Sequence, residues 1–315
     1  MTDLSIIIVN TSEWGVLRPC LRSIHDQMSG IEIEVIVVDN ASTDGSRNMI
    51  AREFPNIQLI NNEKNIGFSA SNNRGIRHAR GKFVLLLNPD TEVLDGALQK
   101  TLDFMNSDPG VGVVGCKLLT ESGRVQPSVR SFPSIWNLLC ESTLLYLLFP
   151  KSKLFGRYYM SYFDYNSVYD VDWLCGAFMM IRREVIDAVG MLDERFFMYS
   201  EEVDYCYRVK QAGFRVVFYP GANIIHHWGG PRTSNKRLIY WVHKSQLLYV
   251  QKYFSGAERL LLESLKYMGI LLRVITYGIA GIFLINKRYL EKANCFGFAL
   301  WSLLGEWRGA GSLRQ

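Results

Sequence analysis

The sequence predicts an α/β fold with a mostly parallel central sheet. Short apolar runs with the length of buried strands alternate with segments in which apolar residues recur at helical spacing. This alternation favours parallel strands joined by right-handed crossovers. The expected strands are residues 4–9, 33–38, 57–60 and 83–88, and the expected helices between them are residues 14–27, 47–54 and 69–79. A hydrophobic fraction of 48% in 315 residues is enough for one large core.

The remainder of the chain is less regular. The next expected elements are a helix at residues 95–106, strands at 111–116, 172–178 and 215–219, and a helix that begins after Ser200. We expect a catalytic domain at residues 1–240 and a basic, apolar helical extension at 241–315. Within the catalytic domain, the Leu-rich and aromatic segment 118–170 is expected to form an insertion that acts as a lid toward an acceptor or a membrane. The alternative for this segment is a core helix with a solvated end.

Charge and cysteine usage limit the class of protein. The six cysteines form no CxxC pair, and the N-terminus begins directly with a predicted strand, so we expect reduced thiols and no signal peptide. No GxGxxG follows the first strand, which disfavours an NAD-binding fold. From residue 231 onward, 13 Lys and Arg face four Glu, a net charge of +9, whereas the first 230 residues carry 22 basic and 26 acidic residues.

The basic C-terminal region has long apolar segments. Residues 268–286 contain one charge, Arg273, and are near the length of a membrane-spanning helix. Arg273 lies inside this segment, and one helical stripe is formed by Leu261, Leu265, Met268, Leu272 and Ile275. An amphipathic helix in the membrane interface is therefore favoured over a span. A helix packed on the protein's own core is the alternative.

The apolar run at residues 84–87 ends abruptly in Asn88-Pro89-Asp90. Pro89 lacks an amide donor and fixes φ, so the strand should end there and Asp90 should project from its carboxyl end. Ligands collect at that edge of open α/β sheets, where a carboxylate can hold a divalent metal against a diphosphate. The alternative role for a single Asp after a strand is a helix cap or a turn.

Two further loops should lie at the same edge of the sheet. Asp39 follows the second strand and can accept hydrogen bonds from a nucleoside base or ribose, with helix capping as the alternative. In the next loop, Gly67 permits a close approach of the backbone to a ligand. Ser69 can cap a helix whose positive end favours phosphate.

A cluster of acidic residues follows Ser200. Glu201, Glu202 and Asp204 fall at the start of a helix, where carboxylates favour the helix dipole. A carboxylate can also act as a general base that takes a proton from a hydroxyl group. Asp204 and Arg208 lie one helical turn apart and should pair.

Two histidines, His226 and His227, come shortly before a Gly pair. Neutral imidazole is a good ligand for divalent metals, although a single histidine is more often structural. The basic residues beyond them, Arg232 among them, can hold a diphosphate.

Four segments taken together carry a family resemblance. They are Val9-Asn10, VDNASTDGS at 38–46, NIGFSASNN at 65–73 and LLLNPD at 85–90. In this order and spacing the chain resembles family 2 inverting glycosyltransferases, and among them the bacterial rhamnosyltransferase-like enzymes of polysaccharide assembly. The resemblance covers about residues 4–235 and implies a glycosyltransferase A-type fold, which is a nucleotide-binding α/β sandwich.

The resemblance implies roles for single residues of the donor site. Asp39 is expected to contact the base, and Asp90 to bind Mg²⁺ or Mn²⁺ on the donor diphosphate. The usual Asp-x-Asp is Asn88-Pro89-Asp90 here, which leaves one anionic ligand. His227 matches the second metal-ligand position, with His226 as the alternative.

The resemblance also implies an acceptor site. Glu202 matches the general base, Glu201 is the alternative, and Asp204 belongs to the same cluster. The further donor and acceptor contacts that we expect are Val9, Asn10, Asn65, Gly67, Phe68, Asn72, Asn88, Trp173, Gly176, Ala177, Arg208 and Arg232.

The implied function is transfer of a sugar with inversion, rhamnose from dTDP-rhamnose, to a hydroxyl of a lipid-linked saccharide in cell-wall or other surface polysaccharide synthesis. The expected location is the cytoplasmic face of the plasma membrane, as a peripheral protein, and a homo-oligomer is left open. One alternative is transfer of another hexose or of galactofuranose from a UDP-sugar, and another is a catalytically silent nucleotide-sugar-binding subunit. The apolar C-terminal segments and the lack of a nucleic-acid motif argue against a nucleic-acid partner.

Overall fold

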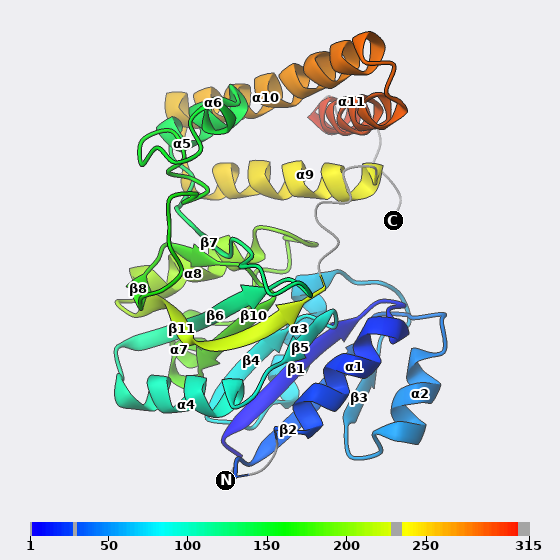
Figure 1. Ribbon diagram of the computed structural model, residues 1–315, viewed down its shortest axis with the longest axis vertical. Helices are drawn as coiled ribbons and strands as arrows, with labels where there is room; N and C mark the ends of the chain where they lie inside the picture. Colours follow the sequence, from blue (N-terminus) through cyan, green and yellow to red (C-terminus); the bar gives the residue numbers. More distant parts are fainter. Residues whose placement is uncertain (1, 28–29, 228–234, 308–315) are drawn as a thin grey trace. The chain divides into compact units, whose positions relative to one another are not determined.

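The computed structural model describes residues 2–27, 30–227 and 235–307, and these form two compact units (Figure 1). The first, here called the sheet unit, comprises Met1–Ser131, Phe163–Phe197 and Glu201–Trp228. The second, here called the helical unit, comprises Phe132–Tyr162, Met198–Ser200 and Gly229–Gln315. This division differs from the predicted one, because residues 132–162 of the expected catalytic-domain insertion join the C-terminal helices.

The sheet unit is built on one mixed sheet in which the strand order is β3-β2-β1-β4-β10-β6-β11-β5, with β8 paired to β11. The strands are β1 Leu4–Asn10, β2 Ile33–Asp39, β3 Gln58–Asn61, β4 Phe83–Leu87, β5 Thr91–Val93, β6 Val111–Leu119, β8 Tyr169–Asp170, β10 Phe178–Arg182 and β11 Arg215–His226. Strands β3, β2, β1 and β4 are parallel, and β6 is parallel to β11. Strand β10 runs antiparallel between β4 and β6. The mostly parallel α/β sheet that the sequence predicts is confirmed.

Helices pack on this sheet through apolar faces. They are α1 Trp14–His25, α2 Ser46–Glu53, α3 Phe68–His78, α4 Ala97–Ser107, α7 Arg183–Val189 and α8 Glu201–Gln211. Helix α3 lies very close to β1, since a Cβ added to Gly75 would be 2.5 Å from Cγ2 of Ile7. The main core contains Ile6, Ile8, Leu85 and Val114, all fully buried.

Two predicted strands have different bounds in the structure. The expected strand at 172–178 is two strands, β9 Trp173–Leu174 and β10, separated by a turn at 175–177 that contains Gly176. Strand β9 leaves the main sheet and pairs with β7, Val129–Arg130. Strand β11 continues to His226, past the predicted end at residue 219, with a register shift between Tyr219 and Asn223.

The helical unit has its own core. Its helices are α5 Ile135–Ser142, α6 Leu145–Leu148, α9 Lys236–Tyr253, α10 Gly256–Phe283 and α11 Lys287–Trp307. Helices α9, α10 and α11 share an apolar cluster that includes Leu247, Ile270 and Phe296. A second cluster joins Leu138 of α5 to Val250 and Leu262, which explains why the insertion belongs to this unit.

A buried ion cluster also ties α5 to α10. Glu141 accepts hydrogen bonds from Lys266 Nζ at 2.8 Å and from Arg273 Nη2 at 2.6 Å, and all three residues are at least 92% buried. Arg273 therefore lies inside the protein rather than at a membrane surface. Of the residues predicted to share one apolar stripe, Leu265 is also buried and Leu272 is half-buried. The other three, Leu261, Met268 and Ile275, are exposed. Among the described residues, α10 is long and apolar enough to cross a membrane by length and composition.

Candidate functional site

Asp90 projects at the carboxyl end of β4, as the sequence predicts. The turn that carries it is held at Asn88, whose carbonyl accepts a hydrogen bond from Thr91 Oγ1 at 2.8 Å. The Asn88 amide in turn donates to the carbonyl of Ala177 at 3.1 Å. The side chain of Asp90 is 26% exposed, so its carboxylate remains accessible while its backbone is fixed.

His226 and His227 have different environments. Nε2 of His226 lies 3.5 Å from Oδ1 of Asp90, and its Nδ1 lies 2.9 Å from Oε1 of Gln126. His227 instead lies between two carboxylates, with Nε2 2.6 Å from Glu92 and Nδ1 2.6 Å from Glu121. Burial alone would lower the pKa of His227, but these two carboxylates outweigh it and raise the pKa above its usual value. His227, the first choice from the sequence, is thus engaged by two carboxylates, and His226 is the histidine beside Asp90. Which of the two binds a metal stays a prediction.

Gln126 fixes the tautomer of His226. Its Nε2 donates to the backbone carbonyl of His226 at 2.7 Å, which leaves Oε1 to accept from the ring Nδ1–H. In the neutral imidazole, the lone pair then belongs to Nε2, the atom that faces Asp90. Sequence reasoning missed Gln126 because it lies 100 residues from its partner, with no motif around it.

The donor set at this position fits a metal shared with a ligand. Among the residues that the structure describes, no three His, Cys, Asp or Glu side chains form a metal cage. Asp90 and His226 supply one hard oxygen and one imidazole nitrogen. Mg²⁺ and Mn²⁺ sites that also take substrate phosphates need only one or two protein ligands, so this pair is compatible with such an ion.

Glu201 and Glu202 begin α8, and their surroundings differ. Glu201 is 6% exposed, and burial together with the charge of Glu202 raises its pKa well above the usual range. Burial and the neighbouring carboxylate thus favour the protonated form of Glu201. The two residues before the helix, Tyr199 and Ser200, have φ values of 66° and 62° in the left-handed region. Ser200 thus does not adopt the extended backbone that is typical of a helix N-cap.

Asp204 and Arg208 form the predicted pair. Arg208 Nε donates to Asp204 Oδ2 at 2.9 Å, and its other nitrogens donate to the carbonyls of Val189 and Met191. Asp204 is fully buried. These contacts anchor α8 to the end of α7 and the residues after it. The Arg208 guanidinium, which we expect at the acceptor, therefore makes its hydrogen bonds within the protein.

The turn 175–177 lies between the two acidic centres. A Cβ added to Gly176 would be 3.9 Å from Cβ of Glu202, and the Ala177 carbonyl holds Asn88. Burial raises the pKa of the neighbouring Cys175 thiol to about 11, and the charges of Glu202 and Asp90 act in the same direction. Both carboxylates are therefore within electrostatic reach of this turn. Trp173 precedes it and donates from Nε1 to the carbonyl of Ser131 at 2.9 Å.

Asp39 is fully buried, and its carboxylate is occupied by the protein. Its oxygens accept from Arg47 Nε at 2.6 Å, from Asn10 Nδ2 at 3.2 Å and from the Ser42 amide at 3.0 Å. Asp39 and Asn10 thus hold the loop after β2, beside buried Val9. Contact of Asp39 with a donor base stays a prediction.

The loop before α3 is held by asparagines. Asn40, which sequence reasoning missed, donates to Asn65 Oδ1 at 2.7 Å and accepts from the Ile66 amide at 3.0 Å. Gly67 has φ of +90°, and an added Cβ would be 2.5 Å from the carbonyl oxygen of Phe197, so no other residue fits there.

Two further predicted ligand contacts near α3, Phe68 and Asn72, make hydrogen bonds within the protein. The Phe68 amide donates to the Phe197 carbonyl at 2.6 Å, and Asn72 Nδ2 donates to the Phe68 carbonyl at 3.0 Å. Arg232 lies outside the described residues.

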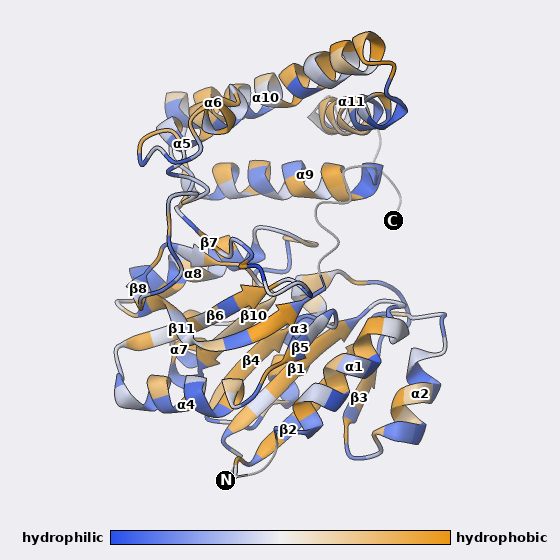
Figure 2. Ribbon diagram, in the orientation of Figure 1, coloured by the Kyte–Doolittle hydropathy of each residue, from blue (hydrophilic) through white to orange (hydrophobic). Residues whose placement is uncertain are grey.

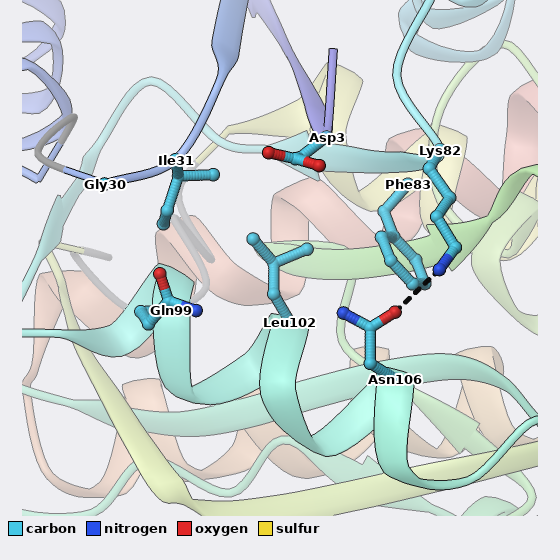
Figure 3. Close-up of a pocket in the computed structure, with 8 residues that line it drawn as sticks. All are labelled: Asp3, Gly30, Ile31, Lys82, Phe83, Gln99, Leu102 and Asn106. Carbon is cyan, nitrogen blue, oxygen red and sulfur yellow. Dashed lines mark hydrogen bonds between the residues drawn. The ribbon is translucent and has the colours of Figure 1, made fainter. Parts of the chain in front are cut away.

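A hollow of about 160 Å³ lies at the opposite edge of the sheet (Figure 3). Asp3, Lys82 and Phe83 from the amino ends of β1 and β4 line it, together with Asn106 of α4. Lys82 Nζ donates to Asn106 Oδ1 across it at 2.8 Å. Because parallel strands bind ligands at their carboxyl ends, we assign no donor contact to this hollow.

Two known proteins are similar to this chain over most of their length. An N-acetylglucosaminyl-diphospho-decaprenol L-rhamnosyltransferase of Mycobacterium tuberculosis is 30% identical over 239 residues, which cover 72% of this chain and 77% of that protein. A low-salt glycan biosynthesis hexosyltransferase, Agl10, of Haloferax volcanii is 28% identical over 261 residues, covering 81% and 78%.

The fold matches solved structures as well. A mannosyltransferase of Pyrobaculum calidifontis, PcManGT, solved with GDP-Man and Mn²⁺, superposes with a TM-score of 0.58 at 14% identity, covering 99% of this chain and 90% of that one. At this identity the match speaks for a glycosyltransferase A-like fold alone. The sequence model of glycosyl transferase family 2 matches residues 5–190, more than half of the chain. The chain is therefore a member of glycosyl transferase family 2.

Proposed function

We propose that this enzyme transfers rhamnose from dTDP-rhamnose, with inversion, to a hydroxyl of a lipid-linked saccharide in surface polysaccharide synthesis. The observation that carries the proposal is the turn 175–177 at the carboxyl edge of the sheet, with Asp90 and His226 on one side and Glu202 on the other. The side with Asp90 and His226 suits a diphosphate leaving group, and the side with Glu202 suits an acceptor hydroxyl.

Glu202 is the proposed general base. The acceptor oxygen forms a bond to the anomeric carbon while the bond from that carbon to the phosphate oxygen breaks. The hydroxyl proton passes to the Glu202 carboxylate, which is the role that inversion requires of a single base. Burial and the charge of Glu202 raise the pKa of Glu201, which favours its protonated form beside the proposed base.

Asp90 and His226 are the proposed protein ligands of Mg²⁺ or Mn²⁺. When bound, the ion neutralises the charge that develops on the departing diphosphate. The residues themselves keep an oxygen and a nitrogen 3.5 Å apart, with the Asp90 side chain partly exposed and the His226 ring buried. Gln126 holds the imidazole in the tautomer that directs its Nε2 lone pair toward Asp90.

The choice of sugar and acceptor rests on the relative from Mycobacterium tuberculosis, which is an N-acetylglucosaminyl-diphospho-decaprenol L-rhamnosyltransferase. The hexosyltransferase relative from Haloferax volcanii supports the alternative of transfer of another hexose. A silent binding subunit is disfavoured, because Asp90, His226 and Glu202 retain a chemically competent arrangement. A lipid-linked acceptor also favours a peripheral location at the cytoplasmic membrane face.

The test is a panel of nucleotide sugars with the purified full chain. We expect dTDP-rhamnose to raise the melting temperature in the presence of Mn²⁺ and to be turned over when a polyprenyl-diphosphate saccharide is added. Stronger stabilisation and turnover with UDP-hexoses would assign the alternative donor. Stabilisation without turnover of any sugar, with several acceptors, would support the silent subunit.

A further inference from the structure

The turn between α10 and α11 exposes an unbroken apolar run. Ile285 and Phe283 are the two most exposed large apolar side chains in the described chain, at 91% and 80%. Their neighbours Ile282 and Leu284 are 70% and 65% exposed. The run is drawn in the hydrophobic colour where α10 meets α11 (Figure 2). Four consecutive apolar residues of this size in water are unfavourable, so a function is required to explain them.

The backbone of this turn is strained at Ile285. Ile285 has φ of 49°, in the left-handed region that β-branched residues rarely adopt and that Gly or Asn normally occupies. Nevertheless the turn is well bonded: the Leu284 amide donates to the Ala280 carbonyl at 2.9 Å, and the Asn286 amide donates to the Gly281 carbonyl at 3.0 Å. Such a turn can enter an apolar phase, because these amides need no water.

Two cations follow the apolar run directly. Lys287 and Arg288 are both exposed, at the start of α11. An apolar tip with cations at its base has the polarity of a segment that enters the acyl region while its charges remain among anionic headgroups.

The outer face of α10 continues the apolar surface away from the tip. The exposed apolar side chains recur at helical spacing and are Leu261, Met268, Leu271, Ile275, Ile279 and Ile282. The opposite face carries Lys266 and Arg273, which are buried and paired with Glu141. Leu262 and Ile270 of α10 also pack in the apolar clusters of the helical unit. This arrangement, apolar on both sides, differs from that of a surface helix in a water-soluble domain, whose outer face is polar. It matches a helix that lies along a bilayer with one face in lipid.

We propose that the turn 282–285 inserts into an anionic bilayer surface, with Lys287 and Arg288 at headgroup level and the outer stripe of α10 along the membrane. The partner is a lipid surface because the apolar tip is flanked by cations, with no acidic side chain between Glu263 and Glu291. This inference rests on the proposed function only for the reason to bind a membrane, which is an acceptor confined to that surface.

The test is co-sedimentation of the full chain with vesicles of phosphatidylcholine alone and of phosphatidylcholine with phosphatidylglycerol. We expect binding to the anionic vesicles that Phe283→Ser/Ile285→Ser weakens by roughly tenfold or more, because two exposed apolar side chains no longer enter lipid. Lys287→Glu/Arg288→Glu should remove the preference for phosphatidylglycerol. Leu148→Ser/Phe149→Ser is the matched control, since it removes comparable exposed apolar side chains at α6.

Two outcomes would overturn the inference. One is unchanged vesicle binding by the Phe283→Ser/Ile285→Ser chain, or an equal loss in the control. The other is a shift from dimer to monomer in light scattering on the same substitution, which would make the turn a contact between two copies. Stabilisation by nucleotide sugars should be unchanged in all these variants, so that a wrong donor assignment and a wrong membrane surface are detected separately.

Discussion

At the scale of single residues, the adjacent carboxylates Glu201 and Glu202 have separate roles because their burial differs. Glu201→Gln should leave turnover nearly unchanged, because an amide closely mimics the neutral acid that burial imposes at this position. Glu202→Gln should reduce turnover by roughly 10²- to 10⁴-fold, because the proton acceptor is lost. Steady-state rates, together with thermal shifts on donor binding, check the pair. If Glu201→Gln abolishes turnover while Glu202→Gln retains it, the assignment of the base is reversed.

Gln126 offers a second test at this scale, because it orients a ligand without touching substrate. Gln126→Leu should weaken Mn²⁺ binding in the presence of a nucleoside diphosphate by roughly tenfold, since the tautomer and ring orientation of His226 are released. Titration calorimetry or electron paramagnetic resonance measures this independently of turnover, with Asp90→Asn as the benchmark for loss of a ligand.

The matched control for this prediction is His227→Gln. Both ring nitrogens of His227 are engaged by Glu92 and Glu121, so its removal should leave Mn²⁺ affinity intact. A large loss of Mn²⁺ affinity in His227→Gln, with none in Gln126→Leu, would show that His227 is the metal ligand, as the sequence motif first indicated.

At the scale of elements, α5, α9 and α10 enclose a group of ionisable residues with strong pH dependence. Burial, with Lys266 and Arg273 nearby, lowers the pKa of His243 from 6.5 to about 3, although Glu141 opposes the shift. Burial alone would raise the pKa of Glu141, but Lys266 and Arg273 lower it to about 2. Both groups take up protons on unfolding in acid, so the helical unit should lose stability as pH falls.

The two lowered pKa values define the pH range in which this loss of stability can be measured. For His243, the contribution is fully present above pH 6.5 and falls by about 1.4 kcal/mol per pH unit toward pH 3. For Glu141, the loss begins below pH 4.5. His243→Gln should therefore flatten the stability curve from urea unfolding between pH 6.5 and 4.5. An unchanged slope in this variant would mean that His243 is protonated in the folded state.

At the scale of the whole molecule, local sequence patterns predict the helices and strands well. They do not predict which distant residues contact one another. Strands such as β1 and β4 follow from continuous apolar runs, and Asp90 follows from the proline that ends β4. The pairs that complete the sites join residues with distant sequence positions: Gln126 with His226, and Glu141 with Lys266 and Arg273. Such contacts depend on tertiary packing, which leaves no periodicity in the sequence. For the same reason, Arg273 was predicted at a membrane interface although it lies in the core.

The shared core of the helical unit changes what truncation should do. The sequence alone predicts a removable membrane anchor after Lys244. In the structure this cut divides α9 and removes α10, so Leu138 loses Val250 and Leu262, and buried Glu141 loses both of its cations. Leaving one buried charge without its partners typically costs about 3–5 kcal/mol.

A chain that ends at Lys244 should therefore aggregate rather than become a soluble enzyme. Size-exclusion chromatography and hydrogen exchange over residues 132–162 measure this directly, with the full-length Phe283→Ser/Ile285→Ser chain as the soluble comparison. That variant alters exposed side chains only and should remain monodisperse with the insertion protected from exchange. A truncated chain that stays soluble, with residues 132–162 equally protected, would show that the insertion is stabilised without α10 and α11. In that case the C-terminal helices would be the removable anchor that their composition suggests.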